Sequence, residues 1–213
     1  MPRIPLAERR AQLLDAAWAV MTRSGLAAAT TRATCAEAGV SQGVFHYCFD
    51  SRDDMLREIA VRLVPMQITA ADAAIADASD VAVAVEQALL AYWDLVEADL
   101  GAHQVLYEIT VAALRSDDSH EIARLQYHRY LDGARDVLDT VAATLGVRWH
   151  RPVDVLARQV VTIVDGLTLH YIVDLDSAAA RAALSAFAAD LAAVAVPSAA
   201  ASDVDTSKGA KNV

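Results

Sequence analysis

Residues 30–52 read TTRATCAEAGVSQGVFHYCFDSR, and this stretch decides the fold of the chain. It predicts two short helices joined by a tight turn. Thr30 is placed as an N-cap, because its hydroxyl can accept a hydrogen bond from the free amides of the first helical turn. Gly39 falls where that helix ends and where the backbone needs a positive φ angle. Ser41 is then expected to be the N-cap of the second helix.

The second helix, predicted over residues 42–49, has an apolar face and a polar face. Phe45 and Phe49 are four residues apart, so both point to the same side and anchor the helix in a core. The opposite side carries Gln42, Gly43, His46 and Tyr47. Two short helices joined in this way can carry the second one crosswise into a DNA groove. The sequence therefore predicts a helix-turn-helix unit.

A third helix is expected to start beside Ser51. Ser51 followed three residues later by Asp54 is a box-like capping signal. Arg52 places a cation beside the free amides at this helix start, which suits a phosphate.

The DNA-facing residues follow from side-chain chemistry. Base edges or nearby phosphates are expected to be contacted by Gln42, His46 and Tyr47, with Gly43 on the same face. The DNA backbone is expected to be contacted by Thr30, Arg32, Ser41 and Arg52. The alternative is that these polar residues only solvate an exposed helix.

Roughly the first quarter of the chain resembles the DNA-binding domain of the TetR family of bacterial transcriptional regulators. The resemblance is carried by Leu13-Leu14-x-Ala16-Ala17, Gly25-Leu26, Thr30-Thr31-Arg32, Ala38-Gly39-Val40-Ser41, Gly43 to Phe49 and Ser51-Arg52. The sequence departs from the usual family pattern at Thr34, His46, Cys48 and Arg52. The resemblance implies a three-helix head followed by a larger helical body that binds a ligand and pairs with a second copy.

Composition agrees with an all-α chain. The 213 residues are rich in Ala, Leu and Val and contain few Gly and Pro, a balance that favours helices. No alternating apolar and polar run is long enough to indicate a sheet. The net charge is −10, but residues 1–52 hold six Arg against four acidic residues, a net +2. A local basic patch can therefore still bind phosphate.

The cysteines and the apolar runs indicate where in the cell the protein is expected to act. Cys35 and Cys48 have no metal-type spacing, and two cysteines in a chain of this length indicate a reducing, cytoplasmic compartment. Cys48 could make DNA binding redox-sensitive, or it could be a small apolar filler. No apolar run reaches membrane-spanning length, so no membrane partner is expected. We expect no cofactor, no metal site and no catalytic residue.

Helical periodicity divides the chain into three regions. We expect a helix-turn-helix domain over residues 1–64, a regulatory, ligand-binding and dimerisation domain over 65–197, and a disordered tail over 198–213. Pro65 interrupts the helix that links head and body, since proline removes a backbone donor. It is either a hinge that transmits motion or a simple helix end. The last helix is expected to run to about Val196, and Ser177 is its candidate cap.

The last two helices and the polar aromatic residues supply the remaining candidates. Small residues on one helix and larger ones on the other suit close packing between two copies, and the candidate dimer residues are Val160, Ile163, Leu167, Ala182 and Ala186. Ordinary packing within one chain is the alternative. A small-molecule pocket needs apolar walls with a few directed polar groups, and its candidates are Trp93, Tyr107, His128 and His170. Core aromatics with satisfied polar tips are the competing explanation.

The predicted function is a homodimeric regulator that binds a palindromic operator in double-stranded DNA. An unidentified small molecule would release it from the operator, so we expect the protein to be a repressor. Two rival classes remain at this point. One is an enzyme that uses His103, His128 or His170 with a carboxylate, and the other is a helical module whose head binds protein. The sequence has no glycine-rich phosphate loop and no nucleophile elbow.

Overall fold

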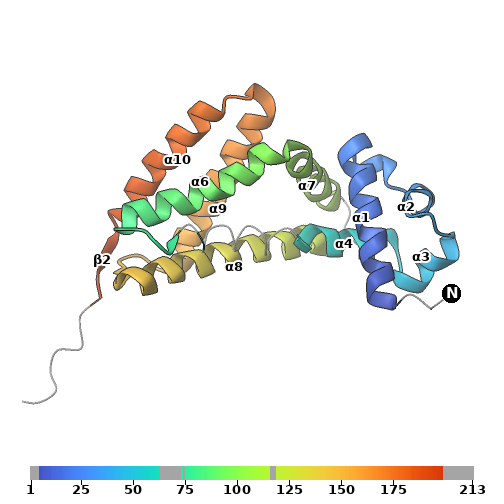
Figure 1. The fold of residues 1–213 in the computed structure, drawn as a ribbon, viewed down its shortest axis with the longest axis horizontal. Helices are drawn as coiled ribbons and strands as arrows, with labels where there is room; N and C mark the ends of the chain where they lie inside the picture. Colours follow the sequence, from blue (N-terminus) through green and yellow to red (C-terminus); the bar gives the residue numbers. More distant parts are fainter. Residues whose placement is uncertain (1–4, 63–72, 74, 116–118, 199–213) are drawn as a thin grey trace, which may run out of the picture.

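The all-α class is confirmed. The computed structural model describes residues 5–62, 73, 75–115 and 119–198. The head comprises α1 (Leu6–Ser24), the short 3-10 helix η1 (Leu26–Ala28), α2 (Thr31–Glu37), α3 (Gln42–Cys48) and α4 (Arg52–Arg62). The body comprises α6 (Val81–Ala98), α7 (Leu100–Ala113), α8 (His120–Leu145), α9 (Val153–Asp174) and α10 (Ser177–Ala192). In Figure 1 the head lies to the right of the body.

The head is built around α1. Its inward residues are those that helical spacing predicts, and Leu13 and Ala17 are fully buried. Phe45 of α3 and Met55 of α4 are fully buried in the same cluster. The apolar stripe of α1 therefore stabilises α2 and α3, which are too short to be stable alone.

In the body, α6 packs chiefly along α10 and α8 along α9. Three of its helices start at an aspartate whose carboxylate accepts a backbone N–H. Asp80 bonds the amide of Val83 at 3.0 Å, Asp99 that of Ala102 at 2.9 Å, and Asp176 that of Ala179 at 3.0 Å. Such caps satisfy amides that have no partner within the helix. Asp176, and not Ser177, thus caps α10.

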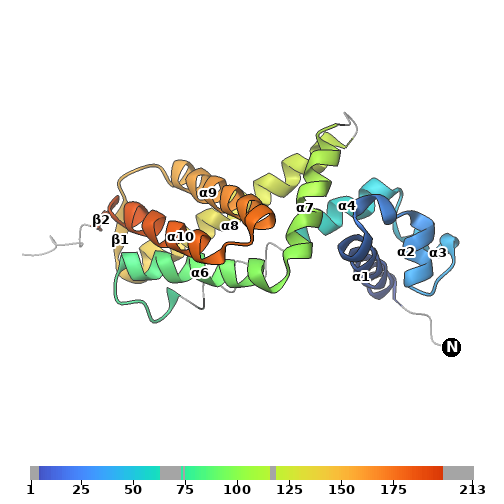
Figure 2. The same cartoon turned by 90° about the horizontal axis from the view of Figure 1, so that it is seen from above.

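Head and body share one core. The buried cluster of the head extends to Val105, Ile109 and Ala113 of α7 and to Ile122 and Ala123 of α8. Seen from above in Figure 2, α4 and α7 lie between the short helices of the head and the rest of the body. A change in the position of α7 would consequently shift the residues of the head that pack against it.

The C-terminal end differs from the prediction in two ways. α10 ends at Ala192, short of Val196, and residues Ala195–Pro197 form strand β2. It pairs antiparallel with β1 (Val147–Trp149). Periodicity could not reveal a pair of three-residue strands that are far apart in sequence. The prediction of no sheet was therefore wrong at this small scale.

Pro65 lies outside the described residues, as do the predicted boundary between residues 64 and 65 and residues 199–213. The hinge interpretation of Pro65 and the domain boundaries stay predictions.

Candidate functional site

The turn between α2 and α3 forms as its residues predict. The Thr30 hydroxyl accepts a hydrogen bond from the amide of Ala33 at 3.1 Å. Gly39 has φ +66°, and the amide of Val40 returns to the carbonyl of Cys35 at 2.9 Å. Ser41 occupies the N-cap position of α3, but its side chain makes no capping hydrogen bond. The position predicted for Ser41 is confirmed, whereas the capping bond is not.

Buried aromatic residues anchor α3. Phe45 and Phe49 are 0% and 1% exposed, with ring centroids 5.4 Å apart. The guanidinium of Arg10 lies 4.5 Å from the Phe49 ring centroid, and it also donates to the carbonyl of Cys48 and pairs with Glu58. The end of α3 is therefore fixed from α1 and α4.

The outer face of α3 is exposed. Its exposed residues are Gln42, Gly43, His46 and Tyr47. The Tyr47 residue is 62% exposed. Thr30, Arg32 and Ser41 are exposed nearby, at or within one residue of the start of α2 and α3. This surface, which we call the recognition face, has the residue types that contact base edges and phosphates.

Arg52 is the exception among the predicted DNA contacts. Its Nε donates to the carbonyl of Ala29 at 2.9 Å and one terminal nitrogen donates to the carbonyl of Leu26 at 2.7 Å. The half-buried guanidinium thus holds the η1 turn. We therefore remove Arg52 from the candidate phosphate contacts. The capping signal beside it is confirmed, since the Asp54 amide donates to Ser51 Oγ at 3.0 Å.

Cys35 and Cys48 are free thiols buried in the head core. Burial raises the pKa of each thiol, which disfavours the reactive thiolate. Their environment fits small apolar fillers rather than redox sensors.

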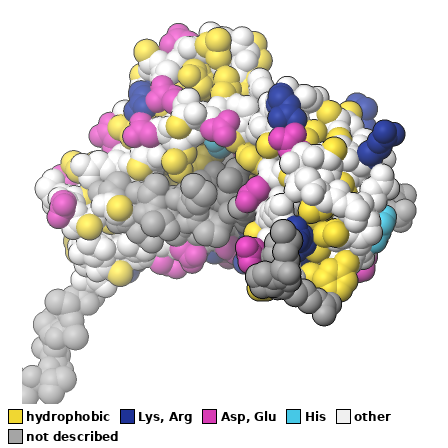
Figure 3. Space-filling view, turned by 45° about the vertical axis from the view of Figure 1, so that its right-hand side comes forward, with side chains coloured by type: hydrophobic (Ala, Val, Ile, Leu, Met, Phe, Trp, Pro, Cys, Tyr) yellow, Lys and Arg dark blue, Asp and Glu magenta, His cyan; other side chains and the backbone are white. Residues whose placement is uncertain are grey.

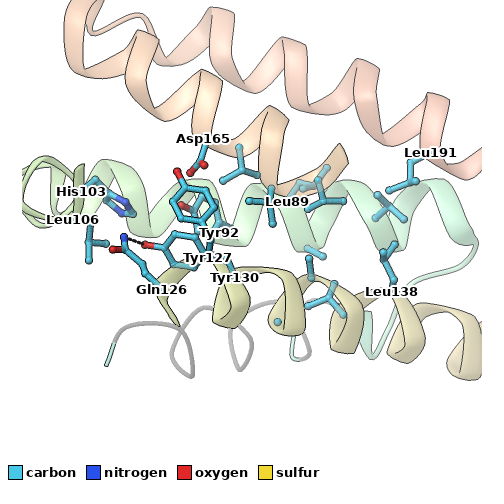
Figure 4. A pocket seen from close by; sticks show the side chains of 18 of the residues that line it. Leu89, Tyr92, His103, Leu106, Gln126, Tyr127, Tyr130, Leu138, Asp165 and Leu191 are labelled. Atoms are coloured by element: carbon cyan, nitrogen blue, oxygen red, sulfur yellow. Dashed lines mark hydrogen bonds between the residues drawn. The ribbon is translucent and has the colours of Figure 1, made fainter. Parts of the chain in front are cut away.

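The body contains a cavity of about 120 Å³. Its apolar wall is formed mainly by Val85, Ala88, Leu89, Leu106, Val137, Leu138, Val141, Val160, Val161, Val164 and Leu191. Its polar groups are Tyr92, His103, Tyr107, Thr110, Gln126, Tyr127, Tyr130 and Asp165. Figure 4 shows Asp165 and the tyrosines at one end and Leu138 with Leu191 at the other. Apolar walls with a few convergent polar groups are typical of small-molecule sites.

Of the four predicted pocket residues, only Tyr107 lines this cavity. Trp93 is 0% exposed and donates from Nε1 to Ser177 Oγ at 3.1 Å, so it is a core residue with a satisfied polar tip. His128 and His170 lie on exposed faces of α8 and α9. The pocket assignments of Trp93, His128 and His170 are therefore wrong for this cavity. A helical pattern gives spacing, but the inward direction depends on how the helices pack.

Four further polar residues line the cavity that were not among the predicted pocket residues: Tyr92, Gln126, Tyr127 and Tyr130. Two hydrogen bonds hold polar side chains of the cavity wall in place. The Tyr107 hydroxyl donates to the backbone carbonyl of Asp165 at 2.7 Å, and Gln126 Nε2 donates to the Tyr130 hydroxyl at 2.8 Å. Burial raises the pKa of all four lining tyrosines and of Asp165, and it lowers the pKa of His103. The signal available in sequence was the polar aromatic spacing on α8.

The predicted dimer residues fall into two groups. Val160 lines the cavity, and Ile163 and Leu167 are half-buried against the body core. Ala182 and Ala186 are exposed on α10. The large apolar residues that α9 leaves exposed are Val155, Leu169 and Val173, with Val173 80% exposed. Both sides of α9 are apolar, so periodicity could not tell which side faces inward.

Within the described residues, no three His, Cys, Asp or Glu side chains are grouped as metal ligands would be. No described helix is both long and apolar enough to span a membrane.

Both the head and the body match known protein families. Residues 13–59 match the model of bacterial regulatory proteins of the TetR family, and residues 81–193 match the C-terminal model of BetI-type transcriptional repressors. HdnoR, the HTH-type nicotine-responsive transcriptional repressor of Paenarthrobacter nicotinovorans, is 27% identical over 172 residues, which cover 81% of this chain and 88% of that protein.

Two solved structures illustrate the shared architecture. A transcriptional regulator from Rhodococcus superposes with a TM-score of 0.67 at 25% identity, covering 88% of this chain and 99% of the other. A regulator from Saccharomonospora viridis, solved in complex with choline, has a TM-score of 0.65 and covers 85% of this chain and 95% of the other; at 19% identity it shows the fold alone. The C-terminal model alone spans more than half of the chain. The chain therefore belongs to the TetR family of bacterial regulatory proteins, and it is a transcriptional repressor rather than an enzyme.

Proposed function

We propose that this repressor acts in the cytoplasm as a homodimer on a palindromic operator, and that a small molecule in the body cavity releases it. The recognition face is the observation that carries the proposal. The helix α3, anchored by Phe45 and Phe49, presents three polar side chains and Gly43 to solvent. In Figure 3 most of the basic side chains in view lie over the head, whereas acidic ones are spread over the body. That distribution directs DNA to the head.

The proposed contacts follow the geometry of α2 and α3. Gln42, His46 and Tyr47 meet base edges or nearby phosphates, and Gly43 allows the backbone close approach. The DNA backbone is contacted by Thr30, Arg32 and Ser41. Arg32 is exposed, and no ion pair joins it to another described residue. Its charge is therefore available to a phosphate.

The second copy is proposed to cover α9 and α10. In Figures 1 and 2 no described element lies over the outer side of these two helices. Leu169 and Val173 are exposed on α9, and Ala182 and Ala186 on α10. A side chain added at Gly166 would meet nothing within 4 Å in the monomer, so this glycine leaves room for a neighbouring helix. Two heads on a two-fold axis then read two half-sites about one DNA turn apart.

The cavity is the proposed effector site. HdnoR is nicotine-responsive by its name, which supports a small-molecule effector for this chain too. Tyr107 lines the cavity, while the carboxylate of the next residue, Glu108, accepts the amide hydrogen of Leu26 in the head. A ligand that shifts α7 would thus move η1. Repression is relieved if the ligand prefers the conformation that DNA does not.

A gel-shift titration with the DNA upstream of the protein's own gene tests this function. Wild type is expected to retard the DNA, with an affinity that falls steeply with salt. Tyr47→Ala should weaken binding by about tenfold or more. Arg32→Ala should weaken it and reduce the salt slope by about one for each phosphate that is no longer neutralised.

Arg129→Ala is the matched control, because Arg129 is an exposed arginine of α8 far from the recognition face. It removes the same charge and should leave affinity unchanged. Equal affinities for wild type, Tyr47→Ala and Arg32→Ala would refute the proposed interface.

A further inference from the structure

Four tyrosines from three helices surround Asp165 at one end of the cavity. They are Tyr92 of α6, Tyr107 of α7, and Tyr127 and Tyr130 of α8. Burial is the main cause of the raised pKa of each tyrosine, and the negative charge of Asp165 adds to it. In Figure 4 the labelled rings gather directly beneath this carboxylate. The side chains of α6, α7, α8 and α9 therefore converge on one point.

The Asp165 carboxylate has no cationic partner in the described part of the chain. Burial raises its pKa, and a hydrogen bond from Tyr127 is the one opposing contribution. None of the described residues that line the cavity is Lys or Arg. A half-buried carboxylate without a counter-charge is unfavourable unless something else supplies that charge.

The rings are held in place before any ligand arrives. Tyr107 donates to the backbone carbonyl of Asp165, Tyr130 accepts from Gln126, and the Tyr127 and Tyr130 rings lie edge to face with centroids 5.5 Å apart. Because burial keeps these phenols protonated, their ring faces are available to a cation without a competing phenolate. Fixed rings around one carboxylate form the kind of aromatic cage that binds ammonium groups.

Resting on the effector role proposed above, we propose that the cavity selects a small monovalent organic cation, an alkyl- or arylammonium. Its charged nitrogen pairs with Asp165 among the tyrosine rings, and its apolar part points to Leu138 and Leu191. A neutral ligand would leave Asp165 uncompensated, and an anion would be repelled by it. The volume of about 120 Å³ resembles cavities that accept benzene, so the ligand has on the order of six to ten non-hydrogen atoms.

Isothermal titration calorimetry of the full-length protein tests this selectivity with two probe pairs. The first is choline and its neutral isostere, in which a tert-butyl group replaces trimethylammonium. The second is phenyltrimethylammonium and its neutral isostere tert-butylbenzene. Each cation is expected to bind at least about thirtyfold more tightly than its isostere. Asp165→Asn should abolish that ratio and leave the affinity of the isosteres unchanged.

Two controls separate loss of the site from loss of the fold. Asp139→Asn removes an exposed carboxylate of α8 outside the cavity and should keep the full ratio. Asp165→Asn itself should not lower the melting temperature without ligand. Because the pKa of Asp165 is raised in the folded state, its stability contribution is lost as pH rises from 3.8 through that raised pKa. The asparagine stays neutral and avoids this loss.

The other titratable groups facing the cavity do not mimic this effect. The four tyrosines have raised pKa values and remain neutral, while burial lowers the pKa of His103 and opposes its protonation.

The outcomes distinguish this inference from the proposed function. Equal binding of cation and isostere, no measurable binding of either cation, or a preference that survives Asp165→Asn would each overturn the cation site. If wild type still retards operator DNA in those cases, the regulator function stands. If wild type fails to retard DNA, the DNA-binding proposal fails whatever the calorimetry shows.

Discussion

Two glycines of the head, Gly39 and Gly43, differ in what the backbone requires of them. Gly39 has φ +66°, and a Cβ added there would meet nothing within 4 Å. The need for glycine is therefore conformational and not steric. Gly43 lies in the helix α3, where an added Cβ would approach only Ser41 Oγ at 3.9 Å. These two exposed glycines, although close in sequence, thus have opposite requirements.

This contrast gives a prediction about stability. Gly39→Ala should lower the free energy of unfolding by about 1–2 kcal/mol, since a left-handed backbone is strained for alanine. Gly43→Ala should raise it by up to about 1 kcal/mol, because alanine favours helix. Urea unfolding of the two variants beside wild type measures both. A Gly39→Ala variant as stable as wild type would show that the turn does not need the positive φ of Gly39.

At the scale of elements, the η1 turn is held from two helices. Glu108 of α7 accepts the amide hydrogen of Leu26, and Arg52 of α4 donates to the carbonyls of Leu26 and Ala29. The same turn therefore links the cavity-lining helix to the head. Arg52, expected from sequence to meet phosphate, instead stabilises this junction.

Removing either side should loosen the junction. Arg52→Ala is expected to lower the free energy of unfolding by about 1–3 kcal/mol, because two carbonyls lose a charged donor. Glu108→Ala should speed hydrogen exchange over residues 25–30 while leaving the cavity region unchanged. Hydrogen-exchange mass spectrometry checks both variants. Glu121→Ala, an exposed glutamate of α8, serves as control, and identical exchange in all three would exclude a junction role.

At the scale of the whole molecule, the outer side of α9 and α10 is the proposed dimer interface. Leu169 and Val173 are 49% and 80% exposed in the monomer, which is costly unless another surface covers them. The body core is complete without these two side chains. They can therefore be changed without emptying the core.

The double change Leu169→Arg with Val173→Arg should convert the proposed dimer to a monomer of 22.7 kDa, because four like charges would meet across the two-fold axis. Analytical ultracentrifugation measures the mass, and a gel shift should show weakened operator binding. Leu114→Arg changes an exposed apolar residue at the end of α7 and should keep the wild-type mass. A dimer that persists in the double variant would place the interface elsewhere.

The candidate site was only partly predictable. The recognition face follows from the short-range signals of Thr30, Gly39 and Phe45, since each acts within one or two helical turns. The cavity does not, because its polar groups come from four helices. Trp93 and His128 have the same local character as Tyr92 and Tyr127, yet only the second pair faces inward.

The sequence by itself determined the helical class, the α2–α3 turn and the polar side of α3, because capping, backbone strain and helical spacing are local properties. The tertiary structure alone decided that Arg52 faces the η1 turn, that Val160 lines a cavity and that Asp165 lies among four tyrosines. Those outcomes depend on the rotation of each helix against its neighbours. Since α8 and α9 carry apolar or aromatic residues on more than one side, many rotations satisfy their periodicity, and only packing of the whole body selects one.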